Sequence, residues 1–194
     1  MTSVINLREF REWRGTPTLV LVDLHQNLTD APVADVDLTR ALANCRVALA
    51  HARVRGFPVA FFRQVATPQF LGAAVRVPSW IAGFEPRRAD MVFDRALPSC
   101  YGSPEFVEMT SYTGGACVIA GLFGESSCLS TMVDAFHRGH SVTYLADASA
   151  SRTHDGIPSE TMHNAITSIA SLYGKVASTQ KWIRLTSQKA EAVG

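Results

Sequence analysis

The sequence lacks three features that would each point to a broad class of protein. It has no excess of either charge, because 18 lysine and arginine residues are balanced by 17 aspartate and glutamate residues, for a net charge of +1. This balance gives no reason to expect nucleic acid or an anionic membrane surface as a partner. The longest apolar runs, such as TLVLV and FPVAFF, are far shorter than the roughly 20 residues that cross a bilayer. The chain also opens without a signal-peptide pattern, so we expect a cytoplasmic protein.

Paired cysteines and cofactor motifs are missing too. The four cysteines are widely spaced and form no C-x-x-C pair, so we expect free thiols in a reducing compartment. There is no P-loop and no G-x-G-x-x-G motif, and the six histidines do not have the spacing of metal ligands. We therefore expect no nucleotide or other cofactor and no metal.

What the sequence does contain is a regular alternation of short apolar segments and helical patterns. The segments expected to be strands are 16–23, 57–64, 89–95, 115–122, 140–148 and 175–185, and the helical patterns are 36–55, 104–115, 128–139 and 159–174. Strands that are apolar along their whole length indicate a parallel sheet covered on both faces. The 194 residues suit one domain with a substantial core. The expected fold is a single α/β domain with a doubly wound, mostly parallel six-stranded sheet.

Three polar residues follow strands of this expected sheet. Asp23 ends the first strand, Arg95 ends the third, and Cys128 lies between the fourth strand and the next helix. The carboxyl ends of parallel strands meet at one edge, where such folds bind ligands. A thiol at a helix N-terminus is favoured as the thiolate, and a carboxylate can accept its proton. These residues predict a nucleophilic site in one crevice.

Three stretches of the chain resemble the isochorismatase-like cysteine hydrolase superfamily, and the resemblance covers about residues 16 to 184. They are LVLVDLHQNL, MVFDRALPSCYGSPEF and GLFGESSCLSTMVDAFHRGHSVTYLADASAS. The resemblance implies a Rossmann-like sheet, an Asp–Lys–Cys triad and a homo-oligomer, either dimer or tetramer. On this pattern Asp23 is the acid/base and Cys128 the nucleophile. The family includes amidohydrolases and isochorismatases that cleave a vinyl ether.

The third triad position departs from the family pattern. Arg95 stands where the family usually has lysine; it keeps the positive charge, but its guanidinium is wider and does not lose a proton. The resemblance also implies an oxyanion hole, which we expect from the N–H groups of Gly124 and Cys128.

A non-proline cis peptide accompanies the oxyanion hole in many family members. Counting back from Cys128 places this bond at Phe123–Gly124, whereas counting forward from Gly121 places it at Leu122–Phe123. The two counts differ because the family's glycine lies one position closer to the cysteine than Gly121 does.

Aromatic residues near the expected strand ends suit the walls of an apolar pocket for a small molecule. Trp80 lies in segment 65–88, the longest stretch without clear periodicity, and loops of that length usually have a function. Phe62, Tyr101 and Phe123 lie close to strand ends. We expect all four to contact substrate.

The sequence therefore predicts a cofactor-independent hydrolase. Cys128 would attack the carbonyl carbon of an amide, carbamoyl or ureido C–N bond, and a thioester would form. Two alternatives stay open. One is a vinyl-ether hydrolase that uses Asp23 without the thiol. The other is a non-catalytic homologue that binds a small ligand, because arginine replaces lysine at position 95.

Overall fold

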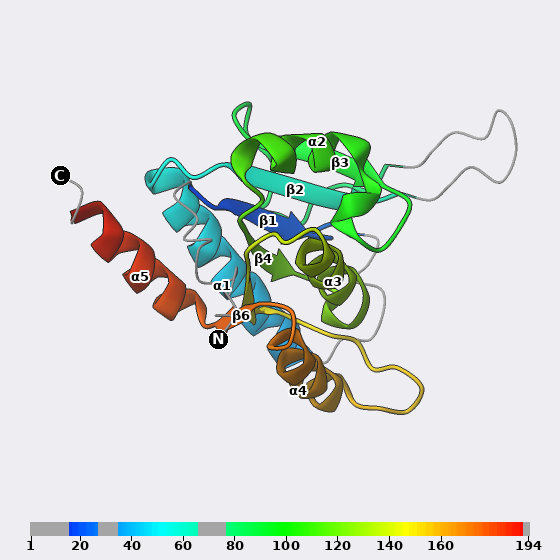
Figure 1. Cartoon of the computed structure of the whole chain (residues 1–194). Helices are drawn as coiled ribbons and strands as arrows, with labels where there is room; N and C mark the ends of the chain where they lie inside the picture. Colours follow the sequence, from blue (N-terminus) through cyan, green and yellow to red (C-terminus); the bar gives the residue numbers. More distant parts are fainter. Residues whose placement is uncertain (1–15, 27–34, 66–76, 192–194) are drawn as a thin grey trace, which may run out of the picture.

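A six-stranded parallel sheet forms the centre of the computed structural model, which describes residues 16–26, 35–65 and 77–191 (Figure 1). Its order is β3-β2-β1-β4-β5-β6, and every strand pair is parallel. This confirms the predicted sheet. The strands are β1 (Thr18–Val22), β2 (Val59–Gln64), β3 (Met91–Arg95), β4 (Cys117–Gly121), β5 (Val142–Ser149) and β6 (Lys175–Ala177).

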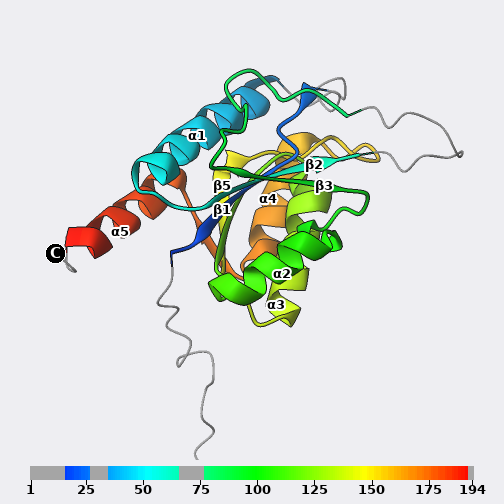
Figure 2. The ribbon, with the colours of Figure 1, turned by 90° about the horizontal axis from the view of Figure 1, so that it is seen from above.

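Helices cover both faces of the sheet (Figure 2). On one face, α1 (Asp35–Val54) and α5 (Thr179–Glu191) pack in an apolar cluster with Leu19 and Leu21 of β1. On the other, α2 (Pro104–Thr113), α3 (Leu129–His137) and α4 (Ser159–Ala170) pack in a second cluster with Val20 and Val22. Alternate residues of β1 thus pack into opposite cores, which explains why the strand is apolar from Leu19 to Val22.

The last predicted strand is wrong over most of its length. Residues 175–185 were expected to be extended, but β6 ends at Ala177 and α5 begins at Thr179. The Asp147 carboxylate accepts hydrogen bonds from the Thr179 backbone N–H at 2.7 Å and from its hydroxyl at 2.8 Å. These bonds satisfy donors in the first turn of α5 and favour a helix start there. Trp182 then packs into the core.

The direction of strand order reverses between β1 and β4, the two central strands. From β1 the chain continues outward to β2 and β3, and it then returns to place β4 on the other side of β1. In doubly wound sheets the crevice at this switch point is where ligands bind. Close contact between the two strand ends requires Gly121, since a Cβ there would lie 2.1 Å from the Val22 carbonyl oxygen.

None of the helices within residues 16–26, 35–65 and 77–191 is long and apolar enough to cross a membrane.

Candidate active site

Asp23 is held at the switch point by its backbone. It directly follows β1, adopts a left-handed conformation with φ 56° and donates its N–H to the Phe62 carbonyl oxygen at 2.9 Å. Aspartate tolerates this conformation better than most residues. The side chain is fully buried, and its Oδ1 accepts a hydrogen bond from the Gln64 N–H at 3.1 Å. Asp23, which follows β1, is therefore anchored to the neighbouring strand β2 through both its backbone and its carboxylate.

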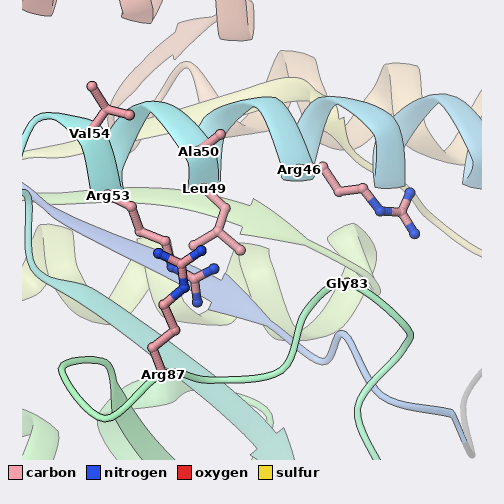
Figure 3. Close-up of a pocket in the computed structure, with 7 residues that line it drawn as sticks. All are labelled: Arg46, Leu49, Ala50, Arg53, Val54, Gly83 and Arg87. Atoms are coloured by element: carbon pink, nitrogen blue, oxygen red, sulfur yellow. The ribbon is translucent and has the colours of Figure 1, made fainter.

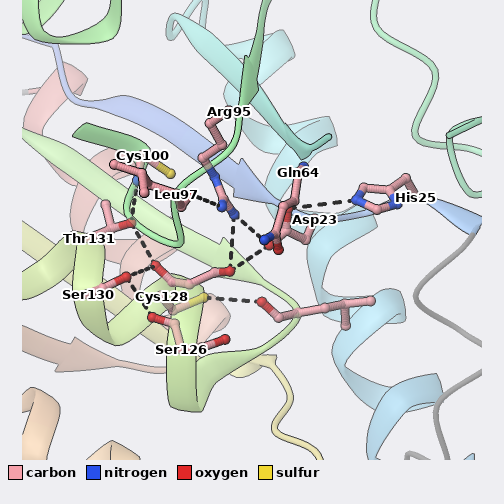
Figure 4. A network of polar contacts seen from close by, with 12 residues as sticks. Asp23, His25, Gln64, Arg95, Leu97, Cys100, Ser126, Cys128, Ser130 and Thr131 are labelled. Atoms are coloured by element: carbon pink, nitrogen blue, oxygen red, sulfur yellow. Dashed lines mark hydrogen bonds and ion pairs between the residues drawn. The ribbon is translucent and has the colours of Figure 1, made fainter. Parts of the chain in front are cut away.

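Arg95, the last residue of β3, forms a buried ion pair with Asp23 (Figure 4). Its Nη2 lies 2.6 Å from Asp23 Oδ2 and also donates to Ser127 Oγ at 3.1 Å, while Nη1 donates to the Leu97 carbonyl oxygen. Both charged side chains are inaccessible to solvent. Burial of charge is tolerated when it is paired and hydrogen-bonded in this way.

Ser127 completes the group. It is buried in the π-helical turn η3 (Gly124–Cys128), which follows β4, and its hydroxyl donates to Asp23 Oδ2 at 2.7 Å. We refer to these three residues as the Asp23–Arg95–Ser127 cluster. The sequence analysis identified Asp23 and Arg95 and missed Ser127.

Cys128 points elsewhere. Its thiol is completely buried in the apolar cluster that includes Met132 and Tyr144, and its Sγ lies 3.7 Å from the Leu122 carbonyl oxygen. Burial raises the pKa of this thiol well above its ordinary value, and the neighbouring Cys100 and Asp23 raise it further. This is opposite to the lowered pKa expected at a helix N-terminus. It is Ser127 that forms hydrogen bonds with both Asp23 and Arg95.

The two N–H groups expected to form an oxyanion hole already have partners. Gly124 donates to the Ala150 carbonyl oxygen at 2.9 Å, and Cys128 donates to the Phe123 carbonyl oxygen at 3.3 Å. The latter bond closes the π-helical turn, a geometry that the sequence analysis did not foresee. In this structure neither N–H group is available to an oxyanion.

The predicted cis peptide is also wrong. Residues 16–26, 35–65 and 77–191 contain no cis bond, so both Leu122–Phe123 and Phe123–Gly124 are trans. The chain turns instead at Phe123, which adopts the left-handed conformation with φ 57° and ψ 55°.

Two of the four aromatic residues expected to contact substrate lie in the core. Phe62 is fully buried, stacked on Phe93 and edge-on to Phe106. Tyr101 is 7% exposed, and its hydroxyl hydrogen-bonds His140 Nδ1 at 2.7 Å. Their rings stabilise the cluster beneath α2 and α3 rather than line an opening.

Trp80 and Phe123 lie nearer the site. Trp80 packs edge-on against Phe61, and its backbone forms an antiparallel bridge with His25. Phe123 is 4% exposed, and the Arg152 guanidinium lies over its ring at 4.1 Å. Trp80 is paired with His25, two residues after Asp23, and Phe123 directly precedes the turn η3 that carries Ser127.

Within the described part of the chain, no group of three or more His, Cys, Asp or Glu side chains is placed to hold a metal ion. A surface hollow of about 330 Å³ lies along α1 (Figure 3), lined in part by Arg46, Arg53 and Arg87. None of the predicted site residues borders it. The candidate chemistry therefore lies at the strand ends and not in this hollow.

A protein-family sequence model covers most of the chain. The sequence model of the isochorismatase domain matches residues 17–181. The chain belongs to the isochorismatase family. It is thus a member of a family of hydrolases. A comparison with curated proteins found no match in sequence.

Solved structures of isochorismatase-like proteins share the fold. An isochorismatase from Pseudomonas putida is 21% identical, with a TM-score of 0.75 and coverage of 93% of this chain and 99% of that one. A cysteine hydrolase from Pseudomonas syringae is 18% identical, with a TM-score of 0.75 and coverage of 87% and 91%. N-carbamoylsarcosine amidase from Thermoplasma acidophilum is 20% identical, with a TM-score of 0.67 and coverage of 84% and 96%. At these identities the likeness shows the fold alone.

One sequence signal could have identified Ser127. In the isochorismatase-family pattern the glycine after the fourth strand lies one position closer to the cysteine than Gly121 lies to Cys128. Counted forward from Gly121, the family position therefore falls on residue 127. The count from Gly121 starts at a position that the sheet holds in place, because Gly121 pairs with Val22.

Proposed function

We propose that this isochorismatase-family hydrolase cleaves a C–N bond of amide, carbamoyl or ureido type in a small molecule, with Ser127 as nucleophile and Asp23 as base. The observation that carries the proposal is the hydrogen bond from Ser127 Oγ to Asp23 Oδ2 at 2.7 Å. A nucleophile within hydrogen-bond reach of its base is the arrangement that covalent catalysis requires.

The hydrogen bonds of Asp23 suit a base. Its two oxygens accept three hydrogen bonds, from the Gln64 N–H, Arg95 Nη2 and Ser127 Oγ. An ionised carboxylate only accepts hydrogen bonds, whereas a protonated one must also donate. Arg95 supplies the compensating positive charge that the family pattern assigns to lysine.

The reaction follows from these positions. Ser127 Oγ forms a bond to the carbonyl carbon, and its proton passes to Asp23. The C–N bond then breaks, and the leaving nitrogen takes that proton from Asp23. Water next attacks the resulting ester with the same carboxylate as base, which releases the acid and restores the Ser127 hydroxyl.

The sequence-based prediction of a Cys128 thioester requires a different arrangement. The thiol would have to leave its apolar cluster and approach Asp23, and its burial opposes formation of the thiolate. The name of the amidase from T. acidophilum agrees with C–N cleavage in this fold. The contacts of the cluster favour serine as the nucleophile.

Vinyl-ether hydrolysis is a second candidate, because the Asp23–Arg95–Ser127 cluster contains no thiol and this reaction requires only an acid. It would need a proton on Asp23, which would disturb the accepted hydrogen bonds. Cytoplasmic location and a dimeric or tetrameric assembly stay predictions.

Three single substitutions test the proposal. Purified wild type and the Asp23→Asn, Ser127→Ala and Cys128→Ala variants are assayed for ammonia release from primary amides and N-carbamoyl amino acids. We expect Asp23→Asn and Ser127→Ala each to lower kcat by at least about 1,000-fold, and Cys128→Ala to retain most activity. Loss of activity in Cys128→Ala alone would restore the thioester route. Loss in Asp23→Asn alone, together with turnover of isochorismate, would favour the vinyl-ether reaction.

A further inference from the structure

His25 is a buried residue that the proposed mechanism does not use. Its side chain is 1% exposed, and neither ring nitrogen has a hydrogen-bond partner. Buried polar atoms in proteins are nearly always hydrogen-bonded, since an unsatisfied one costs about 1–3 kcal/mol. An imidazole with both nitrogens unpaired beside a reactive carboxylate therefore calls for a functional explanation.

The backbone around His25 is held on both sides. Gln26 donates its N–H to the Ser79 carbonyl oxygen at 2.8 Å, and Ile81 donates to the Leu24 carbonyl oxygen at 3.0 Å. These bonds form the bridge between His25 and Trp80. These bonds hold the main chain that carries the ring, and the ring itself is buried.

The ring lies beside the oxygen of Asp23 that Ser127 does not contact. His25 Nε2 is 3.8 Å from Asp23 Oδ1, which is too far for a hydrogen bond. Figure 4 shows His25 and Arg95 on opposite sides of Asp23. Oδ2 is occupied by Arg95 and Ser127, whereas Oδ1 accepts only the long bond from Gln64 among the contacts above. A carboxylate oxygen can accept a second hydrogen bond.

One atom can satisfy both groups at once. An atom placed 2.8 Å from Nε2 and 2.8 Å from Oδ1 would see them about 85° apart, given their 3.8 Å separation. In the tautomer with hydrogen on Nδ1, Nε2 is an acceptor, as is Oδ1. In that tautomer the atom must carry two hydrogens, as a water oxygen or the nitrogen of an unsubstituted –NH2 group does. Of these two, the –NH2 group belongs to the substrates of the proposed reaction.

We propose that His25 is a substrate-contacting residue that, together with Asp23 Oδ1, holds the –NH2 group that leaves as ammonia, and so selects primary amides and terminal carbamoyl groups. The inference rests on the proposed C–N hydrolysis. The two oxygens of Asp23 then divide the work. Oδ2 accepts the proton of the nucleophile, and Oδ1 keeps the leaving nitrogen at the same carboxyl group. An N-methyl group would replace one of the two donors with a carbon.

Two variants of His25 distinguish this contact from a structural role. Glutamine carries its amide at about the distance of imidazole Nε2, whereas asparagine reaches only about as far as Nδ1. The substrates are benzamide, nicotinamide and N-carbamoylglycine, each with its N-methyl counterpart. We expect wild type and His25→Gln to prefer the unsubstituted substrates. We expect His25→Asn to lose roughly 10- to 100-fold in kcat/KM and most of that preference.

A binding measurement separates this inference from the proposed function. The ¹⁵N resonance of His25 Nε2 is followed in wild type during titration with benzamide and N-methylbenzamide. A shift with benzamide, and none with N-methylbenzamide, supports the contact between His25 and the –NH2 group. If no amide is hydrolysed, the proposed function is overturned, but this evidence for the binding site stands. Suppose instead that His25→Asn hydrolyses amides as fast and as selectively as wild type, and that the His25 resonance of wild type does not move. This result would overturn the role of His25 and leave the proposed function in place. Absence of both binding and turnover would overturn both.

Discussion

The Ser127 hydroxyl lies 2.7 Å from Asp23 Oδ2 although the two residues are 104 positions apart in the sequence. The contact exists because β1 and β4 are neighbours and each residue lies just beyond the carboxyl end of its strand. It links the proposed nucleophile to its base without a histidine between them.

Removal of the Arg95 side chain should destabilise the protein strongly. Arg95→Ala leaves the Asp23 carboxylate buried without its counter-ion, and loss of one partner of a buried pair typically costs about 3–5 kcal/mol. Urea unfolding followed by circular dichroism measures the change.

Arg40→Ala is the matched control for this prediction. Arg40 pairs with Asp37 at 2.8 Å within α1, and the Arg40 side chain is 60% exposed. We expect a loss below about 1 kcal/mol. Equal losses for the two variants would mean that the buried pair contributes no more than a surface one.

A substitution at Gly121 should disrupt the switch point. Gly121 has φ 139°, and a Cβ would lie 2.1 Å from the Val22 carbonyl oxygen. Gly121→Ala should therefore cost more than about 3 kcal/mol or prevent folding. Gly156 also has a positive φ of 78°, but a Cβ there meets nothing within 4 Å. Gly156→Ala should cost only about 1 kcal/mol, and thermal melts compare the two.

The Cys128 thiol should react slowly in the folded protein. Because burial raises its pKa, the thiolate fraction at pH 8 is smaller than that of a free cysteine with a pKa of about 8.5. Peptide-mapped alkylation by iodoacetamide should label Cys128 no faster than the buried Cys45, in wild type and Asp23→Asn alike. Rapid labelling of Cys128 that depends on Asp23 would support the thioester mechanism.

His51 should make stability fall in mildly acidic solution. Burial, and secondarily Arg55, lowers the pKa of His51 below 6.5, so near that pH the unfolded chain binds more protons than the folded one. The free energy of unfolding should therefore rise as the pH rises from the pKa of folded His51 to 6.5. The same stability is lost as the pH falls through this window. Urea unfolding from pH 5 to pH 8 should show a steeper slope for wild type than for His51→Gln.

The sheet could be predicted from the sequence because its strands are apolar on both faces and alternate with helical patterns. TLVLV at β1 and CVIAG at β4 are completely buried, and no other element type accounts for such short apolar runs between helices. The segment 178–185 was mistaken for a strand because the start of its helix depends on hydrogen bonds that Thr179 donates to a distant residue, Asp147.

The site could be predicted only in part. Asp23 follows β1 and Arg95 ends β3. The carboxyl ends of the strands in a parallel sheet lie at one edge, so the sequence alone places both residues there. The choice between Ser127 and Cys128 depends on one residue of register in the turn η3, and Phe123 directly before this turn has a left-handed conformation. No local pattern predicts that rotation. The orphaned nitrogens of His25 likewise depend on what surrounds the ring in three dimensions.

The position of Asp23 and Ser127 after the two central strands also constrains how the protein acquires activity. Pairing of Leu19 with Val118 joins parts of the chain that are far apart in sequence, and such non-local contacts form slowly because a long loop must close first. Until β1 and β4 pair, Asp23 and Ser127 belong to separate halves of the chain. During refolding, the return of catalytic activity should therefore report when these two halves pair. It should not depend on how early α1 or α3 becomes helical.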